Sequence, residues 1–196
     1  GVKSGAVDHI LFPSDIVENA NQIVSDLTSI FPVYEGQFVF GPMAKIGWGT
    51  PSLITLEMGL LIEVPDPIQI AIAGVLKTLL PDEDSKLLSL QVAFLGTIDF
   101  EAGLISFDAS IYNSKLITFV LAGDMALRLA WKDNPNFLIT VGGFHPSYEP
   151  PPLSLPDLDR ISISLVTGNN PRITLDAYFA ITSNTCLLYT SPSPRD

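Results

Sequence analysis

The sequence predicts a mainly β protein: an antiparallel, meander-type sheet with one N-terminal amphipathic helix packed on it. Two observations predict the sheet. From about residue 37 apolar and small or polar residues alternate with a period of two, and short turn-forming stretches separate the alternating segments. The helix follows from a single stretch near the start in which apolar residues recur at helical spacing. The chain has 196 residues, 47% of them hydrophobic and 16% charged, which excludes a disordered chain.

The helix is expected at about residues 15–31, after an irregular start at 1–13. Asp15 is placed as its N-cap, with Glu18 three residues later as in a capping box, and Pro32 ends it. Its apolar stripe consists of Ile16, Ala20, Ile23, Val24, Leu27 and Phe31. Such a stripe needs a partner surface, and a sheet face is the simplest one.

The strands are expected where the alternation is clearest. These segments are 68–73, 88–98, 104–111, 119–131, 161–166 and 173–180. The alternation separates a face of bulky apolar side chains from a face of mainly Ala, Ser, Thr and Gly with a few Asp and Arg. We expect ordinary core packing for this sheet.

Turn residues divide the strands. Residues 99–103 form a predicted hairpin connection, Asn113-Ser114 another turn, and the Asn-Pro stretches 132–136 and 168–171 two more. The stretch 145–156 is rich in proline and is expected to be an extended loop or crossover. Connections this short place neighbours in sequence side by side in the sheet.

Composition and motifs exclude several functions. The formal net charge of −11 disfavours nucleic acid and anionic membrane surfaces. No apolar run reaches the roughly 18 residues of a membrane-spanning helix. The one cysteine, Cys186, cannot support a disulfide framework or a thiolate metal site, and no phosphate-loop or metalloprotease motif occurs. No cofactor and no metal are therefore expected.

The last eleven residues, 186–196, resemble the in-frame translation of a transposase-type sequencing adapter, codon by codon. The natural sequence is then expected to stop near Thr185, so that residues 14–185 form a truncated single domain from a metagenomic fragment. We expect the tail to be extended or poorly determined and to pack on nothing in a conserved pattern, whereas a buried central strand with Leu187, Leu188 and Tyr189 in the core would contradict the adapter origin. The strand at 172–183 is expected to keep one edge unpaired.

Four segments resemble a family of large, repetitive, β-rich microbial proteins known only as a domain of unknown function. They are Gly41–Pro51, Leu121–Trp131, Asn134–Pro146 and Asn170–Thr185, and the resemblance spans about residues 31–185. It implies a long β-rich parent protein and no established activity, catalytic residue or ligand.

Candidate catalytic residues are few. Asp108 and Asp124 share the small-residue face of adjacent predicted strands, and such a carboxylate pair suits glycosidase chemistry. The alternative is a cross-strand ion pair of Arg128 with either aspartate on a solvated face. His145, at a strand end, is a candidate acid, base or ligand, and the alternative is a hydrogen-bonded turn histidine.

Candidate ligand-binding residues lie on the bulky face. They are Phe94, Phe107, Leu121, Met125 and Leu129, together with the glycine-flanked Trp48. An exposed strip of these side chains would favour an apolar ligand, and burial under the helix would exclude it.

Three functions follow from these observations. The first is a structural or interaction module of a large β-rich protein, without catalysis, whose partner is the remainder of its own polypeptide. The second is binding of an apolar ligand or lipid along an open sheet face. The third is a hydrolase with a carboxylate or histidine cleft.

Overall fold

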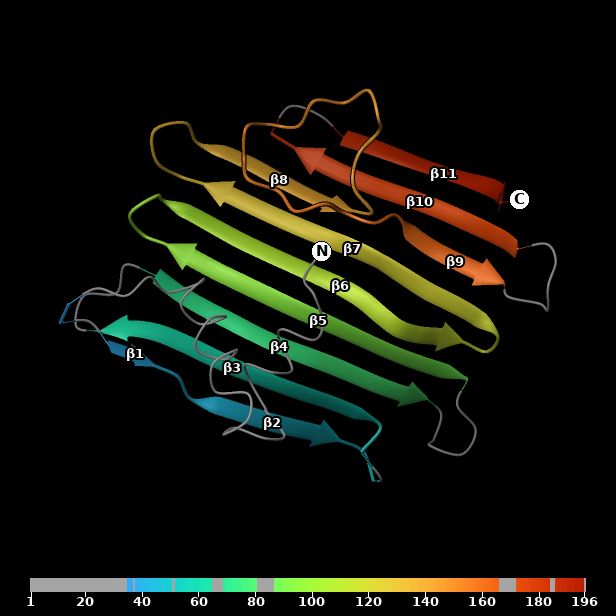
Figure 1. Cartoon of the computed structure of the whole chain (residues 1–196), viewed down its shortest axis with the longest axis horizontal. Coiled ribbons are helices and arrows are strands. Elements are labelled where there is room, and N and C mark those ends of the chain that lie inside the picture. The colour runs from blue at the N-terminus through green and yellow to red at the C-terminus, as the bar shows by residue number, and fades with distance from the viewer. Residues whose placement is uncertain are drawn as a thin grey trace.

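The computed structural model describes residues 35–36, 38–50, 52–64, 69–80, 87–165, 172–183 and 186–195. Within these residues the chain forms one antiparallel sheet of eleven strands and no helix, as Figure 1 shows. A mainly β, antiparallel fold is thus confirmed. The predicted helix at 15–31, the irregular start at 1–13 and the predicted turn at 168–171 lie outside the described residues.

The strands follow the predicted alternating segments closely and extend most of them. Their bounds are β1 Phe38–Phe40, β2 Met43–Trp48, β3 Ile54–Val64, β4 Gln69–Leu80, β5 Leu88–Asp99, β6 Leu104–Leu116, β7 Phe119–Ala130, β8 Asn136–Val141, β9 Ile161–Leu165, β10 Arg172–Thr182 and β11 Cys186–Arg195.

The centre of the sheet is a meander from β3 to β8, in which each strand pairs with the next in sequence. The register of β4 on β5 is unbroken from Gln69 opposite Asp99 to Leu80 opposite Leu88. The predicted hairpin connection at 99–103 is present. The Asp99 carboxylate accepts a hydrogen bond of 2.7 Å from the Ala102 amide, and Gly103 adopts the positive φ of 65° that the turn requires.

The predicted turn at Asn113-Ser114 is wrong, because β6 continues through it as a bulge. Pairing with β7 shifts register between Ile111 and Ser114, and Asn113 takes a φ of 45°. The Ser114 hydroxyl accepts a 2.8 Å hydrogen bond from the Gln91 amide of β5, which ties the bulge to the neighbouring strand. Asn tolerates left-handed backbone in bulges and turns alike, so its presence did not distinguish the two.

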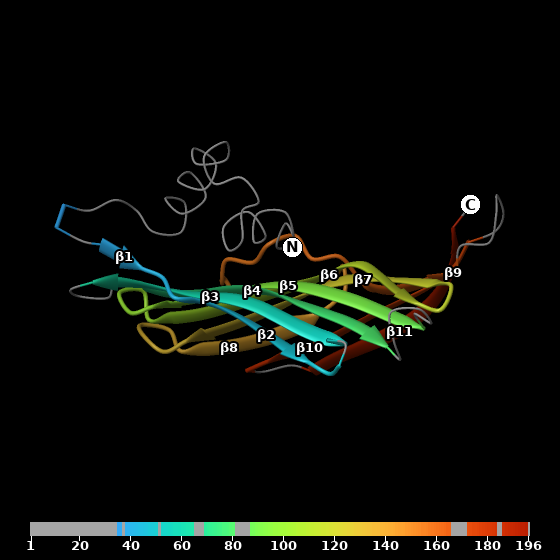
Figure 2. The same cartoon turned by 90° about the horizontal axis from the view of Figure 1, so that it is seen from below.

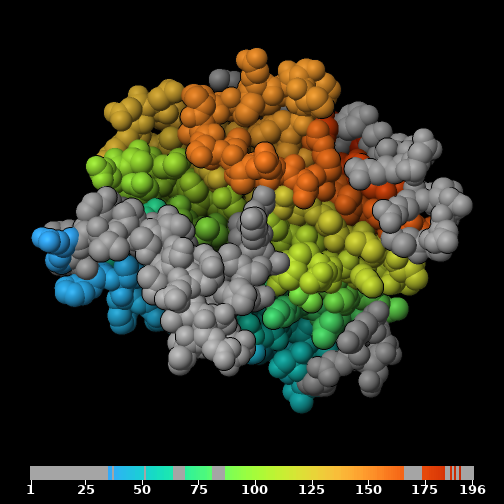
Figure 3. Space-filling view, viewed as in Figure 1, coloured from blue at the N-terminus to red at the C-terminus, as the bar shows by residue number. Residues whose placement is uncertain are grey.

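Strands β8 and β9 occupy one position in the sheet in succession. Both pair with β7 and with β10: β8 along residues 125–130 of β7, and β9 along residues 119–122. Residues 142–160, which we call the crossover, connect them without regular structure, as predicted for 145–156. The crossover leaves the plane of the sheet and lies over one face of it, as seen edge-on in Figure 2 and as the orange atoms of Figure 3.

The two faces of the sheet differ in burial. The crossover face holds the odd-numbered residues of β3–β5 and the even-numbered residues of β6 (to Ser110), β7, β8 and β10. Ala73, Ala93, Ala126 and Leu138 on this face are at most 1% exposed. The small-residue face was expected to be solvated around Arg128, and this is wrong: small side chains admit a close second layer.

The opposite side, which we call the apolar face, holds the alternate residues of the same strands together with the odd-numbered residues of β9. Its described bulky side chains are half-buried or exposed, with Leu129 at 39%, Ile163 at 37% and Leu175 at 43%. Neighbours within the sheet cover such side chains in part, and the crossover is on the other side (Figure 2).

The tail was expected to be extended or poorly determined and to pack on nothing in a conserved pattern, and it is an extended strand at the edge of the sheet. The expectation that it would leave β10 with an unpaired edge is wrong. Strand β11 pairs with β10 from Ile181 opposite Cys186 to Arg172 opposite Arg195. It is an edge strand in which Leu188 is 75% exposed. Edge pairing needs only backbone amides and carbonyls, so an extended segment can supply it whatever its side chains are.

Gly74 in β4 provides a test of the packing within the sheet. A Cβ there would overlap the Phe94 ring and lie 2.6 Å from the Glu57 carbonyl oxygen. Gly74→Ala is expected to lower the free energy of unfolding by about 1–3 kcal/mol, measured by urea denaturation. Gly47→Ala on the exposed strand β2 meets only the Ser52 side chain, which can rotate, and is the matched control. Equal effects of the two substitutions would contradict this account.

Candidate functional site

Arg128 and Asp108 form a buried ion pair between β7 and β6. The guanidinium donates two parallel hydrogen bonds, Nη1 to Oδ1 at 2.8 Å and Nη2 to Oδ2 at 3.0 Å. The two side chains are only 5% and 18% exposed. This is the two-pronged geometry in which Arg binds carboxylate most strongly. The Asp108 carboxylate is therefore held as the counterion of Arg128.

The same guanidinium also holds the crossover. Its Nε donates a 2.8 Å hydrogen bond to the carbonyl oxygen of Ser154, in the middle of the crossover. Arg128 therefore joins three segments, β6, β7 and the crossover, through one planar group whose donors are fixed in direction.

Asp124 fastens the end of the crossover. Its carboxylate accepts a 2.8 Å hydrogen bond from the Asp159 amide, and its own amide donates to the Asp159 carbonyl oxygen at 3.1 Å. A Cβ on the preceding Gly123, whose φ is 144°, would lie 2.9 Å from the Arg160 carbonyl oxygen. Glycine is thus required where the crossover approaches β7.

The two candidate carboxylates occupy diagonal positions on adjacent strands. Asp108 lies opposite Ala126, and Asp124 lies opposite Ser110, so both project to the crossover face. Each carboxylate is engaged in a structural contact, with Arg128 or with the Asp159 amide. A glycosidase pair instead needs one carboxylate to hold or exchange a proton beside the substrate.

Arg160 is a further anchor that the sequence analysis did not identify. Its guanidinium donates to the carbonyl oxygens of Gly142 at 2.9 Å and Phe144 at 2.5 Å. The guanidinium carbon also stands 4.3 Å from the centre of the Tyr178 ring. Arg160 immediately precedes β9 in a stretch without periodic pattern, so no sequence signal linked it to residues 142 and 144.

His145 belongs to a surface turn. The residue is exposed, its Nδ1 accepts a 3.1 Å hydrogen bond from the Ser147 amide, and its carbonyl oxygen accepts one of 2.9 Å from the Tyr148 amide. These contacts match the turn alternative. In the part of the chain that the structure describes, no group of three His, Cys, Asp or Glu residues is placed to hold a metal ion.

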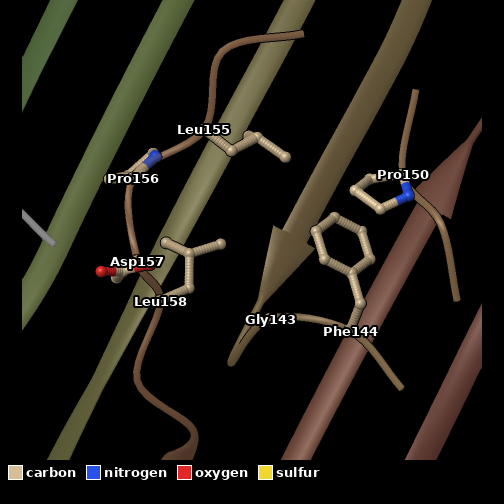
Figure 4. A pocket seen from close by; sticks show the side chains of 7 residues that line it. All are labelled: Gly143, Phe144, Pro150, Leu155, Pro156, Asp157 and Leu158. Carbon is tan, nitrogen blue, oxygen red and sulfur yellow. The ribbon is translucent and has the colours of Figure 1, made fainter. Parts of the chain in front are cut away.

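A small pocket of about 270 Å³ lies within the crossover, near the end of β8 (Figure 4). Its surface is polar and apolar in similar parts, and the Asp157 side chain points away from Phe144. The lining residues are Gly143, Phe144, Pro150, Leu155, Pro156, Asp157 and Leu158. None of the predicted site residues lies in it.

The structure brings five of the predicted ligand-binding residues together on the apolar face. The rings of Phe94 and Phe107, on β5 and β6, stack with centroids 5.9 Å apart. The neighbouring strand β7 adds Leu121, Met125 and Leu129 on the same side. Trp48 lies farther along this face, at the end of β2, and is 50% exposed.

The apolar face carries no ionisable side chain between β3 and β10 among the described residues. The acidic and basic residues of these strands project to the crossover face, as Glu57, Lys77 and Asp108 do. This holds on both sides of the bulge in β6. A row of apolar residues crosses three of its strands, where Leu121 lies opposite Ile163 and Ile163 opposite Leu175. Ile163 and Leu175 are exposed and Leu121 is half-buried.

Breaking the buried ion pair should be costly. Arg128→Met leaves the mostly buried Asp108 carboxylate without its counterion, and is expected to lower the free energy of unfolding by about 3 kcal/mol. Lys132→Met, which removes an exposed ammonium that donates to the Phe100 and Glu101 carbonyl oxygens, is the control and should cost about 1 kcal/mol or less. Adding Asp108→Leu to Arg128→Met should recover part of the lost free energy of unfolding. The coupling is measured by urea denaturation of the two single variants and the double variant. A cycle without coupling would contradict the assignment.

Release of the crossover should be detectable by proteolysis. Asp124→Ala removes the acceptor of the Asp159 amide, so residues 144–159 should open more often and be cut several-fold faster by chymotrypsin under native conditions. Asp99→Ala, which removes a comparable carboxylate contact in the hairpin at 99–103, is the control. An unchanged cleavage rate would show that Asp124 does not hold the crossover.

No helix of the described residues has the length and hydrophobicity to cross a membrane.

Comparison with known proteins places the chain in a family without assigning an activity. No curated protein and no solved structure matches the chain. A family model described as "Family of unknown function (DUF6603)" matches residues 1–188. The chain therefore belongs to this family of unknown function.

Proposed function

We propose that the chain is a structural and interaction module of a larger β-rich protein, and that its apolar face is an interaction surface. The observation that carries the proposal is the uncharged, half-exposed face that spans β3 to β10. A soluble protein that leaves such a surface uncovered loses the free energy of burying it. The apolar face is therefore expected to meet an apolar partner.

The size of this face supports an interaction surface over an ordinary patch. Along the path β3-β4-β5-β6-β7-β8-β10 there are seven strands. At roughly 4.8 Å between strands and 3.3 Å per residue, the face covers on the order of 1,000 Å². The largest apolar patch of a typical monomer is about 300–600 Å².

The ionisable groups support a structural role over a catalytic one. The Arg128–Asp108 pair, the Asp124 carboxylate and the Arg160 guanidinium all hold the crossover or the sheet. Buried ionic groups of this kind position segments of a fold. The crossover face is then an internal surface, and the apolar face is the one left for a partner.

Binding of an apolar ligand or lipid is the second candidate, favoured by the row Leu121, Ile163 and Leu175, in which Ile163 and Leu175 are exposed. An anionic lipid is disfavoured, because the net charge of −11 opposes its approach.

The proposal is tested by comparing the two faces. Leu129→Gln and Ile163→Thr on the apolar face should each cost less than about 1 kcal/mol of unfolding free energy and should raise solubility. Leu138→Gln on the crossover face, where Leu138 is 0% exposed, should cost about 3 kcal/mol or more. Urea denaturation is measured at a protein concentration where the midpoint no longer depends on concentration. Equal losses of unfolding free energy on both faces would show that the apolar face is part of the core and would contradict the proposal.

A further inference from the structure

We infer that the partner on the apolar face is a second copy of this chain, so that two sheets pack face to face as a two-layered sandwich. The inference rests on the proposed interaction surface and names its occupant. It is carried by the area of the face, by the distribution of charge, and by the way the crossover closes the other side of the sheet.

The area suffices for a stable dimer. Specific interfaces bury about 800 Å² on each partner, and the apolar face offers on the order of 1,000 Å² by its strand count and spacing. A two-fold dimer uses the same patch on both copies, and closed two-fold dimers are the commonest soluble oligomers.

The charge distribution permits self-association despite the net charge of −11. The described acidic residues of the strands all project to the crossover face; they are Glu57, Glu63, Asp99, Asp108, Asp124 and Asp176. In a face-to-face pair they would lie on the two outer surfaces, separated by a sheet-to-sheet distance of roughly 10 Å and by both sheets. No like charges would be buried at the contact.

The crossover limits what else can cover the sheet. Arg128, Asp124 and Arg160 fasten it over β7, β8 and β10 on one side only. Each copy then has one face that the crossover covers at these strands and one apolar face that it leaves open. Two such sheets can bury each other's apolar face, because the interior of a β-sandwich consists of two inward-facing apolar faces.

The test is sedimentation velocity of the full chain over a range of concentrations, with a matched pair of charge substitutions. A dimer is expected for the unmodified chain. Leu129→Asp with Leu175→Asp should weaken dimerisation at least about 30-fold, because each copy would bury two unpaired carboxylates at the contact. The control is Leu87→Asp with Ile117→Asp, which adds the same charge at exposed apolar residues outside the face and should leave the dimer intact. Circular dichroism checks that each variant keeps its β-sheet.

Three results would overturn the inference. A dimer that persists in Leu129→Asp/Leu175→Asp would place the contact elsewhere, for example at the exposed edge strand β2. A monomer at every concentration that binds the dye ANS would leave the apolar face free for a different protein. Flotation of the chain with neutral phosphatidylcholine vesicles, abolished by the same two substitutions, would assign the face to lipid. In all three cases the unequal cost of substitutions on the two faces would still hold, so failure here is distinct from failure of the proposed interaction surface.

Discussion

The fastening of the crossover to one face of the sheet is the contact on which the rest of the structure depends. Arg128 binds Asp108 on β6 and the Ser154 carbonyl oxygen on the crossover with one guanidinium. The crossover lies on the side of the small residues and covers it at β7, β8 and β10, where Ala126, Leu138 and Ala180 are fully buried. The charged side chains beneath the crossover are paired or hydrogen-bonded, as expected for buried ionic groups. The opposite face is left with large apolar side chains and no described cover.

This arrangement reverses the simplest view of an alternating sheet, in which bulky side chains form the core and small ones face water. Here the bulkiest residues are half-exposed, whereas alanines such as Ala73, Ala93 and Ala126 are fully buried. Small side chains let a second layer lie close to the sheet. At position 123 only glycine fits, because a Cβ there would lie 2.9 Å from the Arg160 carbonyl oxygen. The cost is a wide apolar surface, which a protein that stays soluble must cover with a partner.

The candidate site illustrates how residues suited to catalysis can serve a fold. The spacing of Asp108, Asp124 and Arg128 placed all three on one face, and β6–β7 pairing confirmed that placement. Their partners came from residues 154 and 159, far along the chain in a proline-rich stretch without periodicity. The family adds no activity to this picture. In this chain the carboxylates and the guanidinium that could serve catalysis instead hold the crossover on the sheet.

The sequence by itself determined β5, β7, β9 and most of β10, the first parts of β4 and β6, the hairpin at 99–103 and the membership of each of these residues in one of two faces. A period of two fixes which side chains share a side, because successive residues of a strand point in opposite directions. It does not say which side will be covered, since alternation is symmetric with respect to the two faces. Only the tertiary structure decided that, through the hydrogen bonds of Arg128, Asp124 and Arg160 to a segment that has no alternation of its own. The same reason hid the Asn113 bulge: its register depends on Gln91 of the neighbouring strand, a contact between residues that are distant in sequence.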